Sequence, residues 1–73
     1  HDTDAQNNLG LCYYEGNGVK KDYVQAVYYY RLAADQGCAD AQYRLALCYY
    51  EGQGVTKDFV QAVHYFYLAT AKG

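Results

Sequence analysis

The amino-acid sequence predicts an all-α fold in which two helix–turn–helix units stack side by side. The first observation is an internal repeat: a shift of 36 positions pairs residues 1–37 with 37–73 and gives 22 identities in 37 pairs. The second is a helical spacing of apolar residues within each unit. The third is the position of glycines and capping residues where helices would end and begin. A repeat of this length is typical of arrays built from helical hairpins.

The first helix of each unit is expected at 4–14 and at 40–50. Ala5, Leu9 and Tyr13 recur at every fourth position and form one apolar stripe along a helix. Cys12 lies on the flank of that stripe. Gly16 follows, and glycine readily takes the left-handed conformation that ends a helix. We therefore expect this stripe to be the buried face of the first helix.

The second helix of each unit is expected at 23–36 and at 59–71. Asp22 and Gln25 have the spacing of a capping box, in which the carboxylate accepts from a backbone N–H and the glutamine reaches back. Apolar residues at helical spacing follow, and a glycine ends each helix. The expected buried stripes are Ala26, Tyr30 and Ala33 in the first unit and Ala62, Phe66 and Ala69 in the second.

A loop with two glycines joins the two helices of each unit, at 15–21 and again at 51–57. The glycines supply positive φ angles, and we expect Val19 and Val55 to point inward and hold the loop in place. A G-x-G pair also occurs in dinucleotide-binding loops, which need a third glycine and a preceding strand. Here Lys21 takes the place of the third glycine and a helix precedes. Phosphate binding is therefore not expected.

Composition narrows the class of protein. The net charge of −2 and the pI near 5.4 argue against a nucleic-acid binder, which carries a clustered basic face. The longest apolar run is the six residues 45–50, far short of a membrane span. Eleven tyrosines suit half-buried layers, because each ring is apolar and its tip polar. The chain starts with histidine and shows no signal peptide, so we expect one domain, 1–73, with repeats at 1–37 and 38–73, from a longer array.

The repeated pattern resembles the Sel-1-like repeat, a relative of the tetratricopeptide repeat. The residues that carry the resemblance are Ala5, Leu9, Gly10, Tyr13, Gly16, Gly18, Val19, Asp22, Ala26, Tyr29, Tyr30, Ala33, Ala34 and Gly37. The second unit matches as well and departs at Ala46, where the family usually has glycine. The resemblance implies an α/α right-handed superhelical solenoid of two 36-residue repeats, with four antiparallel helices.

Proteins of this family are generally scaffolds and adaptors that present a curved helical surface to other proteins. The resemblance therefore implies a non-enzymatic module that binds a protein or peptide partner and neighbouring repeats, without nucleic acid, membrane insertion or cofactor. A spacer that binds nothing itself is an alternative. Another is a weak hydrolase, because some disulfide-rich secreted relatives are associated with β-lactam binding. The cysteine positions of those relatives are Ala34 and Gln42 here, and no nucleophile motif is present, so that subgroup is not supported.

The three cysteines and His64 are the remaining candidates for chemistry. His64 has no partner at metal-ligand or catalytic spacing, and its repeat counterpart is Tyr28, so we expect a surface side chain and no metal site. Cys12 and Cys48 occupy equivalent positions on helices too far apart for a disulfide, so we expect reduced, half-buried packing residues. Cys38, in the turn between the units, is expected to be an exposed thiol. Reduced cysteines favour a reducing compartment.

A candidate protein-binding face lies opposite the expected buried stripe of the first helices. On a wheel of about 100° per residue centred on Leu9, these far-side positions are mostly apolar or aromatic in both units. In related helical arrays the first helices line the concave surface, so we expect this stripe to face a peptide groove. The face comprises Asn7, Leu11, Tyr14, Tyr43, Leu47 and Tyr50, with Arg44 at its rim. Packing of the same residues against flanking repeats remains an alternative.

Two repeats leave both ends of the array open, whereas helical arrays usually need about three units for stability. We predict that a third unit fused to the chain raises the melting temperature, because each new interface adds a stabilising nearest-neighbour contact. Thermal unfolding followed by circular dichroism measures this difference. An unchanged melting temperature would mean that the two units already close their own core.

Overall fold

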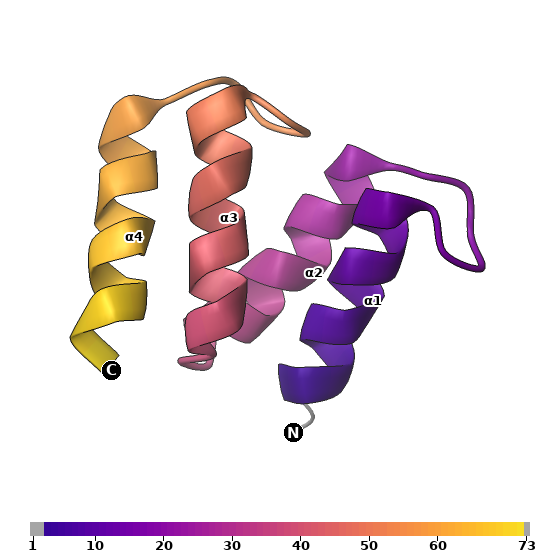
Figure 1. Cartoon of the computed structure of the whole chain (residues 1–73), viewed down its shortest axis with the longest axis horizontal. Coiled ribbons are helices and arrows are strands. Elements are labelled where there is room, and N and C mark those ends of the chain that lie inside the picture. The colour runs from indigo at the N-terminus through magenta and orange to yellow at the C-terminus, as the bar shows by residue number, and fades with distance from the viewer. Residues whose placement is uncertain (1–2, 73) are drawn as a thin grey trace.

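The computed structural model describes residues 3–72 and folds them into four α-helices joined by short connections (Figure 1). The helices are α1 (Thr3–Glu15), α2 (Tyr23–Asp35), α3 (Ala39–Glu51) and α4 (Phe59–Lys72). Each boundary lies within one residue of the position expected from the sequence, and no described residue is in a strand. The prediction of an all-α fold with two helical hairpins is therefore confirmed.

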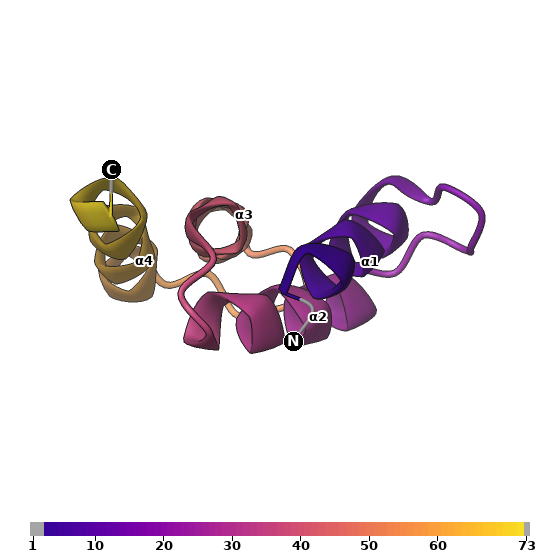
Figure 2. The same cartoon turned by 90° about the horizontal axis from the view of Figure 1, so that it is seen from below.

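Each helix runs antiparallel to the one before it and packs against it, so α1 contacts α2, α2 contacts α3, and α3 contacts α4 (Figure 1). Seen from below, α2 lies under α1 and α3 and bridges them (Figure 2). The described part of the chain is flat, with extents of 32 × 28 × 14 Å along its principal axes. This arrangement gives α2 a helix on each side, whereas α1 and α4 each have one outer flank.

Asp22 begins α2, and its side chain joins the two helices of the first unit. The carboxylate Oδ1 accepts from the backbone N–H groups of Val24 at 3.0 Å and Gln25 at 3.2 Å. The N–H of Asp22 donates to the carbonyl of Tyr13, 2.9 Å away, at the end of α1. Because that N–H is already bonded to the preceding helix, the glutamine half of the expected capping box is not needed. Asp58 repeats the arrangement with Val60, Gln61 and Tyr49.

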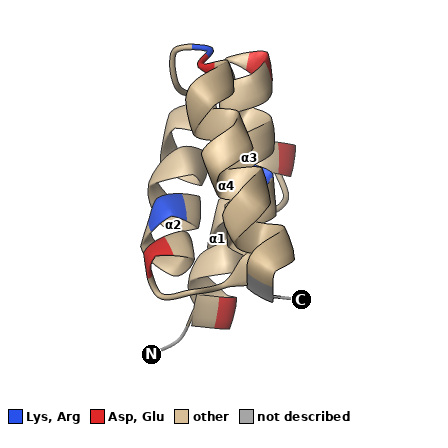
Figure 3. Cartoon of the chain, turned by 90° about the vertical axis from the view of Figure 1, so that its left-hand side faces the viewer, with Lys and Arg blue, Asp and Glu red and all other residues tan. Residues whose placement is uncertain are grey.

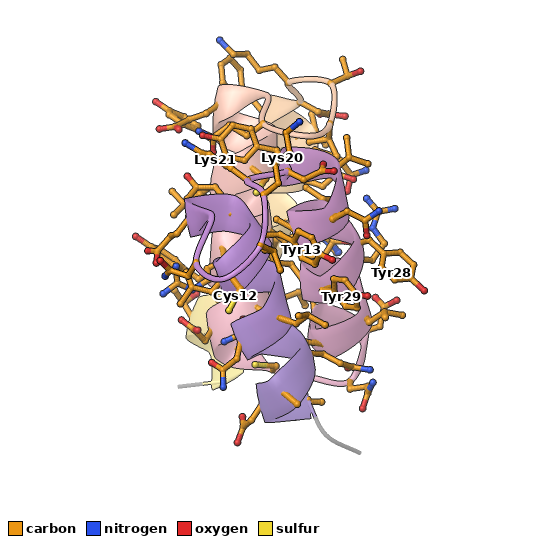
Figure 4. The ribbon with its side chains drawn as sticks, turned by 90° about the vertical axis from the view of Figure 1, so that its right-hand side faces the viewer. Cys12, Tyr13, Lys20, Lys21, Tyr28 and Tyr29 are labelled. Carbon is orange, nitrogen blue, oxygen red and sulfur yellow. The ribbon has the colours of Figure 1, made fainter. Side chains whose placement is uncertain are left out.

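Aromatic pairs hold the two helices of each unit at the same relative position. The Tyr13 and Tyr29 rings stack with centroids 5.8 Å apart and planes 4° from parallel (Figure 4). The equivalent pair, Tyr49 and Tyr65, stacks at 5.9 Å with the same angle. Such pairs stabilise packing by about 1 kcal/mol beyond the area they bury. The repeat in sequence is therefore a repeat in geometry as well.

The core is centred on the packing of α2 against its neighbours. Tyr30 is the largest fully buried side chain, and its ring lies over Gly10 of α1, where a Cβ would approach ring carbons to 2.8 Å. Small side chains on α2 and α3 let the backbones approach closely elsewhere. The buried apolar residues are Ala26, Val27, Tyr30, Ala33, Ala34, Ala41, Leu45, Ala46, Cys48 and Ala62.

The expected burial of the first-helix stripe is correct for α3 and wrong for α1. Ala41 and Leu45 are fully buried, but their counterparts Ala5 and Leu9 are exposed. The loop valines differ in the same way: Val55 packs partly buried against the core, while Val19 is exposed. The reason is that α2 covers this side of α3, and no described helix covers the same side of α1. Burial of the stripe is therefore a property of the contact between repeats.

Gly18 and Gly54 occupy equivalent loop positions with φ of 78° and 76°, yet only Gly54 touches the neighbouring unit. A Cβ on Gly54 would lie 2.6 Å from the carbonyl carbon of Tyr23 and 3.0 Å from the amide nitrogen of Val24. A Cβ on Gly18 would meet no heavy atom within 4 Å.

We predict that Gly54→Ala destabilises the protein more than Gly18→Ala. Both variants place alanine in the left-handed region at a cost of about 1–2 kcal/mol. Gly54→Ala additionally forces the loop away from the start of α2, which adds about 1–3 kcal/mol. Urea denaturation of the two variants isolates this inter-repeat contact, because the backbone strain is common to both. Equal losses of stability would show that the loop of the second unit does not press against α2.

Candidate functional site

A small pocket lies where α1 and α3 diverge above α2. It has a volume of about 30 Å³ and is lined by Tyr14 from α1, Tyr30 from α2, and Arg44 and Leu47 from α3. A volume of this size holds one or two water molecules or one small chemical group. Three aromatic or aliphatic side chains and one guanidinium therefore surround a site for a single group.

Tyr14 forms the α1 wall of the pocket. Its ring packs against Tyr23 at 5.1 Å and against Tyr30 at 6.4 Å between centroids. Its hydroxyl donates to Oε1 of Gln53, 2.8 Å away in the loop of the second unit. Burial raises the pKa of Tyr14, although the bond to Gln53 acts in the opposite direction. This side chain therefore belongs to the pocket and also ties the first unit to the second.

Arg44 supplies the positive charge of the pocket. Its Nε donates to Oδ2 of Asp40 one turn earlier on α3, at 3.2 Å, and forms a salt bridge there. Burial works to raise the pKa of Asp40, but the hydrogen bonds from Asn7 and Arg44 prevail and lower it. Burial likewise opposes the charge of Arg44, and Asp40 outweighs it and raises the Arg44 pKa. Both groups are therefore charged at neutral pH, and the guanidinium is held at the pocket by a neighbouring carboxylate.

Tyr30 forms the floor, and it is the residue that the sequence did not assign to the candidate face. Burial raises its pKa to about 12, against the effect of the nearby Arg44 charge. Helical spacing identified Tyr30 as a core residue, which is correct, since its side chain is almost fully buried. The signal for its second role is Gly10 on α1, since a missing side chain there lets the ring reach the base of the space between α1 and α3.

The structure brings part of the expected face together. Tyr14, Arg44 and Leu47 surround the pocket, and Leu11 is half-buried on α1. Tyr43 and Tyr50 are about half exposed on α3 and turn toward α4. Their rings contact Phe66 at 5.6 Å and Phe59 at 5.4 Å, respectively.

Asn7 is a correction to the expected face. It is buried instead of lining an open surface, and its Nδ2 donates to Oδ2 of Asp40 at 2.6 Å. The helical wheel gives the angle of a residue about its own helix and not the position of the next unit. Asn7 faces α3, so its role is to join the two units and hold the carboxylate beside Arg44.

The three cysteines are free thiols, and two of the expectations for them need correction. Cys12 is partly buried, as expected, but Cys48 is completely buried because α2 covers it. Cys38 is also partly buried and packs against the core, so it is not the exposed thiol that its place in a turn suggested. His64 is exposed, with its ring edge on Tyr65 at 5.1 Å.

Within residues 3–72, no three His, Cys, Asp or Glu side chains gather in a way that could hold a metal ion. None of the helices described is both long enough and apolar enough to cross a membrane.

Two capped helical hairpins that repeat the same internal contacts define a protein of the helical-repeat solenoid class. The chain belongs to the Sel1 repeat family, whose model matches residues 3–38 and 39–73. Proteins of this family are generally non-enzymatic scaffolds that mediate protein–protein interactions. No curated protein matches the chain by sequence.

Solved structures agree with this assignment. A protective antigen of uropathogenic Escherichia coli strains with an SLR fold is 45% identical at a TM-score of 0.96, over 97% of this chain and 15% of that one. A Sel1 repeat protein from Oxalobacter formigenes is 39% identical at a TM-score of 0.96, and the match covers 97% of this chain and 29% of that one. Cysteine-rich protein B of Helicobacter pylori is 35% identical at a TM-score of 0.93, and the match covers 97% of this chain and 53% of that one. The chain thus spans between about a seventh and about half of these relatives.

Because the thiol of Cys48 is buried, the free energy of unfolding depends on pH in the alkaline range. Burial raises its pKa from 9.0 to about 11, with a smaller effect of the same sign from Glu51. The unfolded chain therefore loses this proton at lower pH than the folded chain. The contribution of the protonated Cys48 thiol to stability is complete below pH 9 and is lost as the pH rises toward 11.

We predict that the free energy of unfolding falls by about 2 kcal/mol between pH 9 and pH 11 because of Cys48. Chemical denaturation at a series of pH values measures the slope. Cys48→Ala should reduce the slope, because it removes the buried thiol. Identical slopes in the Cys48→Ala variant and the unmodified protein would contradict this assignment.

Proposed function

We propose that this chain is a non-enzymatic protein-interaction module and that its partner is a peptide segment. The segment would lie over the pocket between α1 and α3 and across the exposed face of α3 that turns toward α4, a surface that we call the peptide groove. The residues that we assign to it are Leu11, Tyr14, Tyr30, Tyr43, Arg44, Leu47 and Tyr50.

The observation that carries the proposal is the chemistry of the pocket. A guanidinium has five N–H donors in a fork that matches a carboxylate, and the bond from Nε of Arg44 to Asp40 uses one of them. The Tyr14 ring and the Leu47 side chain provide apolar contact beside that charge. The pocket therefore suits a carboxylate that is flanked by a large apolar side chain. We expect the partner to carry an acidic residue next to an aromatic or aliphatic one.

Tyr43 and Tyr50 would supply most of the remaining contact area. Both are exposed, and each is held on one side by an aromatic ring of α4, so ordering them on binding costs little entropy. Tyrosines in this situation are common among the residues that dominate binding energy.

A spacer role is the second candidate, and the contacts of Tyr14 favour it. The Tyr14 hydroxyl already bonds Gln53, and its ring packs on Tyr23 and Tyr30. A side chain engaged in this way also fits a purely structural link between units. A hydrolase role gains no support, because no described contact places a serine, threonine or cysteine beside a general base.

We predict that a displayed library of random peptides, screened against the folded chain, yields peptides in which Asp or Glu adjoins a large apolar residue. Arg44→Gln should weaken the selected peptides about tenfold or more, equivalent to about 1.4 kcal/mol, because the carboxylate loses its charged donor. Tyr50→Ala should weaken them by a similar factor. Isothermal titration calorimetry measures both changes.

Tyr28→Ala is the matched control, since Tyr28 is an exposed tyrosine of α2 that points away from α1 (Figure 4). It should leave the affinity unchanged, and circular dichroism should show the same helix content in all variants. Peptides without acidic residues, or peptides that bind Arg44→Gln normally, would favour the spacer role.

A further inference from the structure

The two outer flanks of the chain correspond to the two halves of the interface that joins its repeats. We call the uncovered side of α1 and its loop the entry face, and it comprises Ala5, Gln6, Leu9, Cys12, Tyr13, Gly18 and Val19. The residues 36 positions later are Ala41, Gln42, Leu45, Cys48, Tyr49, Gly54 and Val55. All seven pairs are identical in residue type. In the second unit α2 covers this set, so the entry face has the chemistry of a helix-binding surface.

Exposure shows that the entry face lacks its cover in the described chain. Leu9 is 38% exposed, whereas Leu45 is 0% exposed under α2. Gly54 lies against the backbone of Tyr23 and Val24 at the start of α2, and Gly18 has an open space in the same place. Cys12 and Tyr13 lie on this outward side of α1 (Figure 4). The surface that binds α2 in the second unit is thus present in the first unit and uncovered.

The outer side of α4 carries the matching half, which we call the exit face: Val63, Tyr67 and Thr70. These residues correspond to Val27, Arg31 and Ala34 of α2, the helix that covers the second unit. Val63 is 66% exposed, whereas Val27, one turn before Arg31 on the side of α2 that faces α3, is 6% exposed. Residues 59–71 include no Asp, Glu, Lys or Arg, and the α4 ribbon shows no charged position on this side (Figure 3). No charge therefore opposes burial of this face.

One polar contact of the internal interface also has a counterpart. Arg31 of α2 donates to the hydroxyl of Tyr49, 2.7 Å away on α3. Tyr67 stands at the position of Arg31 and Tyr13 at that of Tyr49. A tyrosine hydroxyl is a donor as well as an acceptor, so the pair can form one hydrogen bond without a charge.

We propose that a second copy of this chain docks its exit face on the entry face of the first, repeating between molecules the packing of α2 on α3. The two faces differ, so the contact is head-to-tail, and each bound molecule leaves one entry face and one exit face for the next. The surface is separate from the peptide groove, so this proposal stands independently of the proposed function.

The decisive experiment mixes two variants that each lack one face. Leu9→Asp damages the entry face and Val63→Asp the exit face, and both positions are exposed, so the fold should remain intact. Analytical ultracentrifugation should show concentration-dependent association of the unmodified chain up to about 1 mM, a range that detects weak affinities. Each variant alone should be monomeric. Their equimolar mixture should form a 1:1 dimer and nothing larger, because one intact face remains on each.

Val60→Asp is the matched control for Val63→Asp. Val60 is 77% exposed on α4, but its counterpart Val24 stays 64% exposed although α2 is packed between two helices. This variant should associate like the unmodified chain. A mixture of Leu9→Asp and Val63→Asp that stays monomeric overturns the proposal, as does the same loss of association in Val60→Asp. A monomeric unmodified chain at about 1 mM overturns it as well, and would leave a flanking repeat of the same type as the occupant.

A second measurement needs no variant. Cys12 belongs to the entry face, and its counterpart Cys48 is fully buried. Alkylation of Cys12, followed by peptide mass mapping, should therefore slow at least fivefold when the protein concentration rises into the range of association. Cys38, in the turn between the repeats and outside both faces, provides the internal reference. Equal slowing of both thiols, or no slowing of Cys12, overturns the proposal.

Discussion

The burial of α2 between α1 and α3 is the interaction on which the rest of the structure depends. Tyr30 fills the space over Gly10 on one side, and Val27 and Ala34 pack toward α3 on the other. Because a helix of this length is marginal alone in water, its stability comes from these two packed flanks and not from intrinsic propensity. The absence of a side chain at Gly10 is the local condition that lets the largest core residue reach its place.

Short backbone contacts transmit this packing along the chain. The N–H of Asp22 bonds the end of α1 while its carboxylate begins α2, and Asp58 does the same for α3 and α4. Gly37 and Cys38 close the turn between the units by donating to the last carbonyls of α2, at 3.0 and 3.1 Å. Each helix therefore starts at a defined angle to the previous one, and the whole unit repeats when its sequence repeats.

The same packing positions the pocket and the outer flanks of the chain. Since α2 lies under both first helices, the space between α1 and α3 has a floor, and Arg44 and Tyr14 meet above it. Asp40 fixes the guanidinium from the α3 side and Asn7 fixes Asp40 from the α1 side, so the charge in the pocket depends on both units. The outer flank of α1 repeats the residues of α3 that α2 covers, and the outer flank of α4 corresponds in the repeat to the covering side of α2. The pocket between α1 and α3 and the character of the two outer flanks therefore both follow from the way α2 packs against its neighbours.

Local chemistry by itself determined the helices, their caps, the turn glycines and the family, because these depend on residues close together in sequence. Asp22, Gly16 and the spacing of Ala26, Tyr30 and Ala33 act within one or two turns. The tertiary structure decided which of two identical residues is buried: Leu45 and Cys48 are covered, whereas Leu9 and Cys12 are not. It also decided that Asn7 joins the units and that Tyr30 reaches the pocket. The physical reason is that a repeated sequence specifies the same helix face twice, while burial of that face depends on whether another helix lies against it.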